Sequence, residues 1–547
     1  MTAFDYATVA IFLAGVLWLG SRFYRWIGSP DDFYVAGRQL TPFMLAAAMT
    51  TANISLFSLV GVSGTAYQSG ISIIWLTWTG NMALVLSGLF VIPVLRRLRI
   101  RTIPEFLEMR YNGAVRILVG ILWVFRLAFW IGVVLYAGVT AAQQLTGIRS
   151  FTFWVCVFAL ITVIYTTSGG MWSVVLTNNV GFFLMMASVL TILPMAMSAV
   201  GWWPGLVAQL PAGHLDFLTQ AGKYNWKTVI AFILLGIQWA TLDQGLLQSA
   251  FSARDARVVS KGMVLSGFMI TPFAFLWITP GLAARLLYPG LPKPEMAVPT
   301  LIVHLLPAGI LGFVICGFLA SGLSTIGSNL NAAATLAAND IYGRFINRKA
   351  SPRRLLVAVR IATVLAGVLM IAVTYVVPYL GGAVDAYLTI ISIMDMPLFV
   401  IAIPYGLLWK RATWQGAMAA YLAGSVAGAV LRFGFGMDVA PVTIISGAVA
   451  ALVCPVVSLL TTGARPIPAP QGPPEPRAPL SFARVVALCV LALGFLLVLG
   501  GILMASQAAP QASPVALTGL AVFFAGGIWT AAIHPASRSP RALESPR

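Results

Sequence analysis

Hydroxyl and amide side chains are concentrated in one segment of this 547-residue chain, within a run of otherwise apolar residues. The segment covers residues 321–335 and reads SGLSTIGSNLNAAAT. Polar oxygens at membrane depth are costly unless they face protein, water or an ion. Ser324 and Thr325 place two uncharged hydroxyl oxygens side by side, which suits a weakly held monovalent cation better than a transition metal. Small residues also let helices pack closely, so a purely structural role is the alternative.

The rest of the chain predicts a membrane setting for this segment. Hydrophobic residues make up 59% of the chain and charged residues 9%, whereas a soluble domain averages about 25% charged residues. Apolar runs of roughly 20 residues recur along the chain, and each predicts a membrane helix because lipid leaves backbone groups no other hydrogen-bond partners. We expect spans at 4–21, 41–68, 72–95, 115–143, 150–167, 173–199, 226–249, 262–287, 307–337, 356–377, 385–408, 413–432, 440–462, 484–505 and 514–533.

Basic residues are distributed unevenly between the connections of these spans. The net charge is +18, and with the N-terminus outside, 26 of the 33 Lys and Arg residues fall on one side of the membrane. This bias predicts that the basic side and the C-terminus are cytoplasmic, in a multi-pass protein of the plasma (inner) membrane. Since topology accounts for the charge, we expect the lipid bilayer and no nucleic acid as a partner.

Two of the expected spans carry polar residues that an inert helix would not need. Residues 50–58 of the second span read TTANISLFS, and residues 236–245 of the seventh read GIQWATLDQG. Interrupted helices at corresponding positions in two halves of a chain indicate the binding site of a transporter. Unwound backbone there frees carbonyl groups for a cation and N–H groups for a solute. Close packing through small residues is again the alternative.

Four motifs resemble those of the sodium/solute symporter family, and the likeness covers about residues 5–435. They are DFYVAGR at 32–38, RTIPEFLEMRYN at 101–112, the segment 321–342 ending in NDIY, and GLLWKRATWQGA at 406–417. The second motif is most similar to the sugar-transporting branch. The resemblance implies an all-α membrane protein with the LeuT-type fold of two inverted five-helix repeats, plus extra N-terminal and C-terminal helices, about 15 in all.

The spans and the resemblance together predict seven regions. They are an N-terminal extra helix and cytoplasmic loop (1–40), the first repeat (41–199), the second repeat (226–408), two peripheral helices (413–462), a Pro-rich cytoplasmic linker (463–483), two C-terminal helices (484–533) and a cytoplasmic tail (534–547).

The resemblance also implies an activity and an ion site. Its sodium ligands correspond to the backbone carbonyls of Thr51, Ile54 and Ser321 and to the hydroxyls of Ser324 and Thr325. Sodium would be the coupling ion, with no other cofactor, and a small organic solute would be carried by alternating access. No catalytic constellation is visible, so we do not expect an enzyme.

The expected solute site is defined less sharply. The resemblance places substrate-binding or gate positions at Asn53, Phe57, Ser58, Thr77, Trp239 and Thr389. Trp75 and Trp78 are further candidates for flat pocket walls. The carboxylates and long amides that would satisfy many sugar hydroxyls are mostly missing, so the sequence does not support a hexose.

Three positions depart from the family pattern and bear on charge and coupling. Asn178 stands where the family usually has an aspartate near the inner end of the sodium path. Asp243 and Asp395 are additional carboxylates that could replace part of that charge. The alternatives are a solvated Asp243 at a helix end and an Asp395 paired with Arg126 or Arg360. Two other functions therefore stay open, a sodium-independent (proton-coupled or facilitative) transporter and a non-transporting membrane sensor.

Overall fold

The computed structural model describes most of the chain. The described residues are 2–22, 40–98, 100, 102–251, 253–307, 309–469 and 481–533, and within the helices the side chains of 17, 19–22, 48, 51, 52, 169–180, 182 and 248 are not described. The motif at 32–38, part of the Pro-rich linker, the tail and the side chain of Asn178 therefore lie outside what can be placed.

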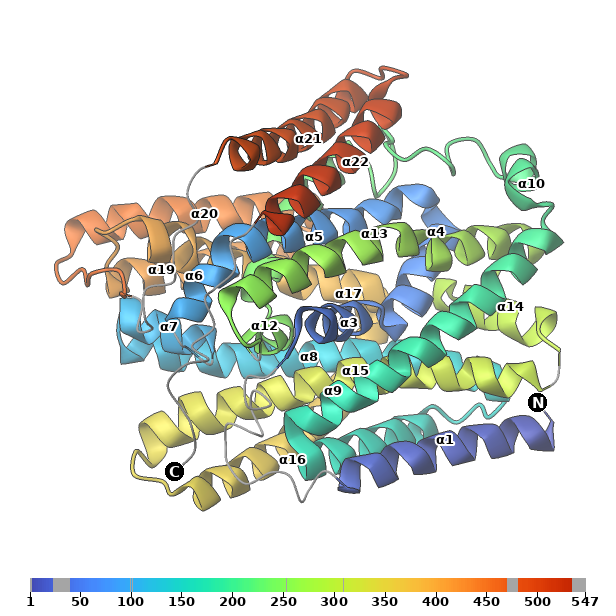
Figure 1. Cartoon of the computed structure of the whole chain (residues 1–547), viewed down its shortest axis with the longest axis horizontal. Coiled ribbons are helices and arrows are strands. Elements are labelled where there is room, and N and C mark those ends of the chain that lie inside the picture. Colours follow the sequence, from blue (N-terminus) through green and yellow to red (C-terminus); the bar gives the residue numbers. More distant parts are fainter. Residues whose placement is uncertain are drawn as a thin grey trace.

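The described residues are almost entirely helical (Figure 1), with one isolated bridge between Leu40 and Ala253. The first half contains α1 (Ala3–Arg22), α3 (Pro42–Asn53), the π-helix η3 (Phe57–Val62), α4 (Ser63–Ser69), η4 (Ile71–Ile73), α5 (Ile74–Leu86), η5 (Ser87–Val91), α6 (Ile92–Arg97), α7 (Ile103–Arg110), α8 (Gly113–Thr146), α9 (Phe151–Ala199), α10 (Trp202–Gln209), α11 (Trp226–Leu242) and α12 (Gln244–Phe251).

The second half contains α13 (Ala256–Leu287), η6 (Pro294–Met296), α14 (Ala297–Leu305), α15 (Ile310–Thr335), η7 (Leu336–Ile346), α16 (Pro352–Val376), η8 (Val377–Leu380), α17 (Ala383–Ile390), η9 (Ile391–Asp395), α18 (Met396–Ala402), η10 (Pro404–Leu408), α19 (Trp414–Ala429), η11 (Val430–Gly434), α20 (Val439–Leu460), α21 (Phe482–Ser506) and α22 (Ala512–Ala532).

Most of the fifteen expected membrane spans correspond to helices of the structure. Among the described residues, 11 helices are long and apolar enough to cross a membrane, or up to 13 if each bent helix pair is one span. The two further expected spans are α1 and the second span, which is broken into α3, η3 and α4. The short helices α7, α10 and α14 lie between spans and were not predicted.

Both predicted interruptions are present. The second span stops at Asn53 and resumes at Phe57, and the seventh stops at Leu242 and resumes at Gln244. The two broken spans also meet at one end, where the N–H of Arg254 donates to the carbonyl of Leu40 over 3.4 Å. A helix break in each half of the chain therefore lies within one bundle.

The expected spans 150–167 and 173–199 correspond to the two arms of one element, α9. In the first arm, Phe158 lies beside Gly322 of α15 and Tyr165 lies beside Gly327. In the second arm, Gly181 lies beside Ala320 and Ser188 lies beside Gly317. The two arms thus run in opposite directions along α15. They are antiparallel, as two separate crossings require.

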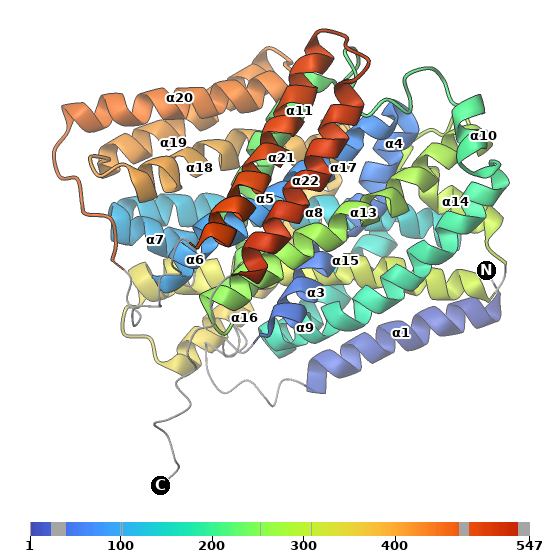
Figure 2. The ribbon, with the colours of Figure 1, turned by 45° about the horizontal axis from the view of Figure 1, so that its top comes forward.

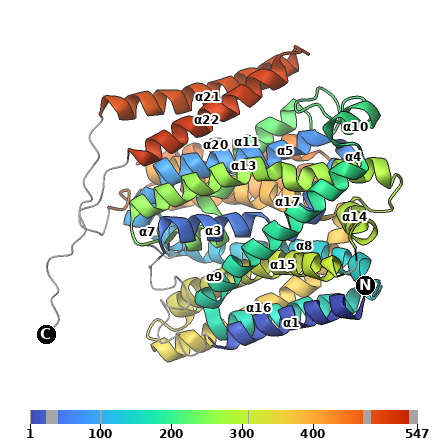
Figure 3. The ribbon, with the colours of Figure 1, turned by 45° about the vertical axis from the view of Figure 1, so that its right-hand side comes forward.

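Helix α15 is the most enclosed of the described candidate spans and packs against α9, α8, α16 and α1. The last two helices, α21 and α22, lie outside the bundle: they run above it in Figures 1 and 3 and across its front in Figure 2. They pack mainly against each other and rest on α5, α11 and α13. The hydroxyl-rich segment of α15 therefore lies in the interior, whereas the C-terminal pair lies outside it.

Candidate functional site

The chain between α3 and η3 is held by polar side chains close to it in sequence. The hydroxyl of Ser58 donates to the carbonyl of Asn53 over 3.0 Å, and the hydroxyl of Ser55 accepts from the N–H of Phe57 over 3.2 Å. These bonds satisfy some of the backbone groups that a helix end leaves unpaired. The polar residues of TTANISLFS, from which the break was predicted, thus also stabilise the non-helical backbone between α3 and η3.

Helix α15 contacts this break directly. The hydroxyl of Ser321 donates to the carbonyl of Ile54 over 2.7 Å, although the two residues are 267 positions apart in the sequence. Both residues are buried. The structure therefore brings together two of the positions predicted to bind sodium, one from each half of the chain.

The hydroxyl pair of α15 lies one turn further along. Ser324 and Thr325 are both buried, and the Thr325 hydroxyl donates to the carbonyl of Ser321 over 3.2 Å. The Ser324 hydroxyl oxygen has no hydrogen-bond partner among the described residues. An unpaired buried hydroxyl is unfavourable, so this atom is suited to a ligand. Thr51 lies in α3, one turn before Ile54, and its side chain is outside the described part.

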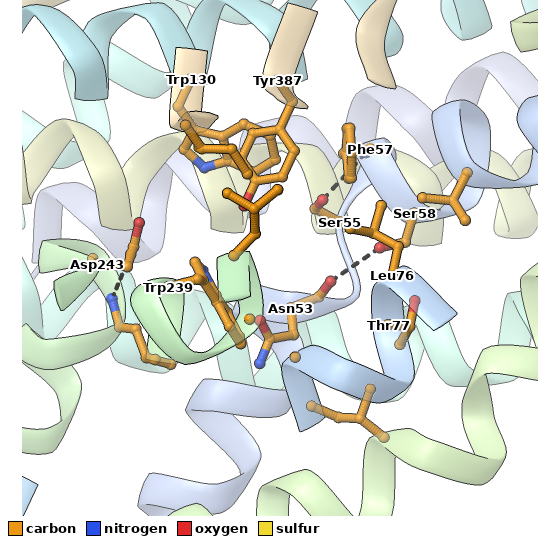
Figure 4. A pocket seen from close by; sticks show the side chains of 18 of the residues that line it. Asn53, Ser55, Phe57, Ser58, Leu76, Thr77, Trp130, Trp239, Asp243 and Tyr387 are labelled. Carbon is orange, nitrogen blue, oxygen red and sulfur yellow. Dashed lines mark hydrogen bonds between the residues drawn. The ribbon is translucent and has the colours of Figure 1, made fainter. Parts of the chain in front are cut away.

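A cavity of about 120 Å³ opens beside the same break (Figure 4). Five of the six positions predicted for the solute line it, namely Asn53, Phe57, Ser58, Thr77 and Trp239. The sixth, Thr389, is not among the lining residues, and its hydroxyl accepts a hydrogen bond from Arg432 over 3.1 Å. The cavity is small compared with the roughly 300–1,000 Å³ of drug-sized ligand pockets.

One side of the cavity is aromatic. Phe57, Trp130 and Tyr387 form a mutual cluster with ring centroids 4.5–5.2 Å apart. Trp239 projects toward the cavity from α11 (Figure 4). Trp130 and Tyr387 were not predicted, because a lone aromatic residue in an apolar span carries no sequence signal that separates a pocket wall from the core.

The other side of the cavity is polar and only partly hydrogen-bonded. Ser55, Asn81, Ser328 and Asn329 add to the predicted Asn53 and Thr77 in its lining. The side-chain amide nitrogen of Asn53 and the amide oxygen of Asn329 have no partner among the described residues. Together they offer one donor and one acceptor to a bound solute. Asn329 lies in the hydroxyl-rich segment and could have been found there.

Asp243 and Asp395 are joined by a single buried arginine. Arg126 on α8 donates to Asp243 and, through Nε, to Asp395, each over 2.8 Å, and its Nη2 lies 2.7 Å from the same Asp395 oxygen. The other oxygen of Asp243 accepts from the N–H of Leu246 over 3.0 Å and so caps α12. Gln238 donates to Asp395 over 3.3 Å.

This cluster decides between the interpretations left open by the sequence. The expectation of a solvated Asp243 is wrong, because the residue is buried and paired. The pairing of Asp395 with Arg126 is confirmed. Neither carboxylate is an isolated charge that could attract a cation to the aromatic side of the cavity.

Two of the three tryptophans considered as pocket walls are structural. The indole N–H of Trp75 donates to the carbonyl of Phe217 over 2.8 Å, and that of Trp78 donates to the carbonyl of Thr271 over 3.0 Å. Both side chains are buried and neither lines the cavity. The hypothesis of a tryptophan wall holds for Trp239 alone among the three.

Comparisons with known proteins agree with this architecture. The family model described as "Sodium:solute symporter family" matches residues 33–424. The "Sodium/glucose cotransporter" of Vibrio parahaemolyticus is 27% identical over 463 residues, which cover 78% of this chain and 83% of that protein. The "Uncharacterized symporter YidK" of Escherichia coli (strain K12) is 28% identical over 346 residues, 60% of each chain.

A solved structure shares the fold. The substrate-bound, outward-open state of a Na+-coupled sialic acid symporter superposes with a TM-score of 0.76, covering 85% of this chain and 99% of its own, at 21% sequence identity. At this identity the likeness establishes the fold, and the prediction of a LeuT-type helical bundle is confirmed.

Proposed function

This chain belongs to the sodium:solute symporter family, and we propose that its sodium ion binds between the break after α3 and the hydroxyl pair of α15. The family and its sodium/glucose cotransporter relatives support sodium-coupled symport of a small organic solute. The unpaired hydroxyl of Ser324, close to the contact between Ser321 and Ile54, is the observation that carries the proposal.

The proposed ligands are all neutral oxygens. They are the carbonyls of Thr51, Ile54 and Ser321 and the hydroxyls of Ser324 and Thr325. Three of these groups already take part in hydrogen bonds: the carbonyl of Ile54 accepts from the Ser321 hydroxyl, and the carbonyl of Ser321 accepts from the Thr325 hydroxyl. A hydroxyl can rotate away and a carbonyl has a second lone pair, so all three remain usable as ligands. Neutral oxygens bind sodium without trapping it.

The ion site and the cavity share two elements, which provides a route for coupling. Asn53 lines the cavity and precedes Ile54, and Ser328 lines it one turn after Ser324, to whose carbonyl its hydroxyl donates over 2.9 Å. Sodium that holds the break against α15 would therefore also fix two walls of the cavity. A coupling free energy of about 1–3 kcal/mol would be typical of such a linkage.

The cavity favours an uncharged solute with one flat face. Asp243 is the one acidic or basic residue among its described lining residues, and both of its oxygens are already bonded. The aromatic cluster suits a flat or apolar face, while Asn53 and Asn329 suit a few polar groups. Relatives are named for glucose, yet the lining offers no free carboxylate to satisfy many hydroxyls.

The test is the thermal stability of the purified protein in sodium, compared with potassium and choline at equal ionic strength. A ligand that binds the folded state raises its melting temperature. We expect sodium to raise it for the native chain and to have no effect on Ser324→Ala/Thr325→Ala. Thr335→Ala is the matched control, because Thr335 is a buried hydroxyl on the same helix that donates to the carbonyl of Asn331.

Three outcomes separate the alternatives. A sodium shift that survives the double substitution would place the ion elsewhere. Equal behaviour of sodium and potassium in the native chain would favour the sodium-independent transporter. A sodium shift without sodium-driven solute uptake in vesicles would favour the non-transporting sensor.

A further inference from the structure

A second cavity lies away from the transport site, between η7 and α16. It encloses about 630 Å³. Its lining residues are Ala337, Ala338, Tyr342, Arg353, Arg354, Val357, Ala358, Ile361, Ala362 and Leu365. In Figures 1 and 2 the corresponding yellow helices lie at the edge of the bundle, side by side, and the two elements are in contact. The cavity is therefore a groove on the outer surface of the helical body.

The wall contributed by α16 is a continuous apolar stripe. Val357, Ile361 and Leu365 line the groove and Val368 continues the stripe beyond it; they are 50%, 55%, 63% and 60% exposed and recur at helical spacing. From Val357 to Val368 the helix rises by about 16 Å, which is half of the roughly 30 Å thickness of a hydrocarbon core. Ala337 and Ala338 on η7 have small side chains, which leaves space on the opposite side of the groove. The groove thus has the length of one leaflet and room for an acyl chain.

The groove ends in two arginines. Arg353 and Arg354 lie in the first turn of α16 and are exposed. No acidic partner is recorded for either among the described residues, whereas nearby Arg344 pairs with Glu108 over 2.5 Å. The helix N-terminus adds a partial positive charge at the same place. Two unpaired guanidinium groups therefore lie at the mouth of an apolar groove.

We propose that this groove binds an anionic glycerophospholipid. The phosphate lies between Arg353 and Arg354, and one acyl chain follows the stripe of α16. Arginine binds phosphate oxygens through paired N–H donors, and basic pockets between membrane helices on the cytoplasmic side are suited to acidic headgroups. The positive-inside distribution places these arginines in the leaflet that is rich in such lipids. The site is independent of the sodium and solute sites.

The test is native mass spectrometry of the full chain in detergent with added phosphatidylglycerol. Phosphatidylcholine with identical acyl chains is the zwitterionic comparison, and glycerol 3-phosphate represents the free headgroup. We expect the native chain to retain phosphatidylglycerol in preference to phosphatidylcholine. Arg353→Gln/Arg354→Gln should weaken that binding by about 30-fold, because each basic residue near an anionic lipid contributes about fivefold.

Two further variants separate this site from general charge attraction. Lys410→Gln/Arg411→Gln removes the same charge from another exposed, basic connection and should leave the preference unchanged. Ala337→Phe fills the groove without changing charge and should weaken phosphatidylglycerol and phosphatidylcholine alike. Equal retention of the two lipids by the native chain would overturn the proposal. So would a loss at Lys410 and Arg411 as large as that at Arg353 and Arg354, or binding of glycerol 3-phosphate as strong as that of the lipid.

Discussion

At the scale of single residues, Arg126 is the centre of the buried electrostatics beside the cavity. It is 1% exposed and touches carboxylates from two other elements, the α11–α12 break and η9. Removing one partner of a buried ion pair costs about 3–5 kcal/mol, because the remaining charge has no water to solvate it. The cluster holds two negative charges and one positive charge, so its members are not equivalent.

Because the three charged residues are not equivalent, two substitutions in the cluster should differ in how much they destabilise the protein. Arg126→Met leaves two buried carboxylates without a counter-charge and should lower the free energy of unfolding by about 3–5 kcal/mol. Asp395→Asn leaves Arg126 paired one-to-one with Asp243 and keeps an amide oxygen as acceptor, so its cost should be smaller. Thermal unfolding in detergent measures both. A larger loss for Asp395→Asn would show that Arg126 is not the dominant charge.

The single residues also show what sequence reasoning can reach. Asn53, Ser324 and Thr325 were found because polar groups within an apolar span need a reason to be there. The bond between Arg432 and Thr389 could not be found, since it joins two helices through a contact that no spacing encodes. The roles of Trp75 and Trp78 likewise depend on the carbonyls of Phe217 and Thr271.

At the scale of elements, α4, the second helix of the broken second span, packs very closely on α13. A Cβ added at Gly281 would fall against the carbonyl of Ser63, the first residue of α4. The backbone of Ser63 cannot move aside as a flexible side chain can. The absence of a side chain at Gly281 therefore sets how close α4 comes to α13, and through η3 where the break lies.

A glycine comparison tests this contact. Gly281→Ala should destabilise the protein by about 1–3 kcal/mol, the usual cost of overpacking. Gly500→Ala is the control, because a Cβ at this helical position on α21 meets nothing within 4 Å. There alanine should be neutral or stabilising by up to about 1 kcal/mol through its helix propensity. Melting temperatures that move in the same direction would contradict the contact.

The elements were predicted with uneven success for a physical reason. Both helix breaks were found because each carries a cluster of polar side chains in a hydrophobic context. The short helices α7, α10 and α14 lie outside the spans, where hydropathy gives no guidance. The two arms of α9 were predicted as separate spans because the sequence TTSGGMW at 166–172 indicates a turn between them, and their antiparallel course along α15 agrees with that prediction.

At the scale of the whole molecule, the α21–α22 hairpin is attached to the outside of the bundle. The family match ends at residue 424, before the hairpin begins. Its contacts with the body include α13 and the bonds from the Gln220 amide to the carbonyls of Ala505 and Ser506, at 3.2 and 3.4 Å. In a bilayer the apolar faces it covers would meet lipid tails instead, which are equally apolar.

The hairpin should therefore be dispensable for the transport core. A chain ending at residue 469 keeps the contact between Arg110 and the carbonyl of Arg465 over 2.6 Å and loses only the hairpin and its linker. We expect the shortened chain to insert into the membrane and to keep its sodium-dependent melting shift. Its free energy of unfolding should fall by about 1 kcal/mol, the scale of lost interhelical hydrogen bonds in membranes. A matched chain of full length, cleaved at a protease site placed in the linker, separates loss of the hairpin from loss of the covalent connection. Loss of the sodium shift in the truncated chain alone would mean that α21 and α22, through α5, α11 and α13, help to set the position of the broken helices.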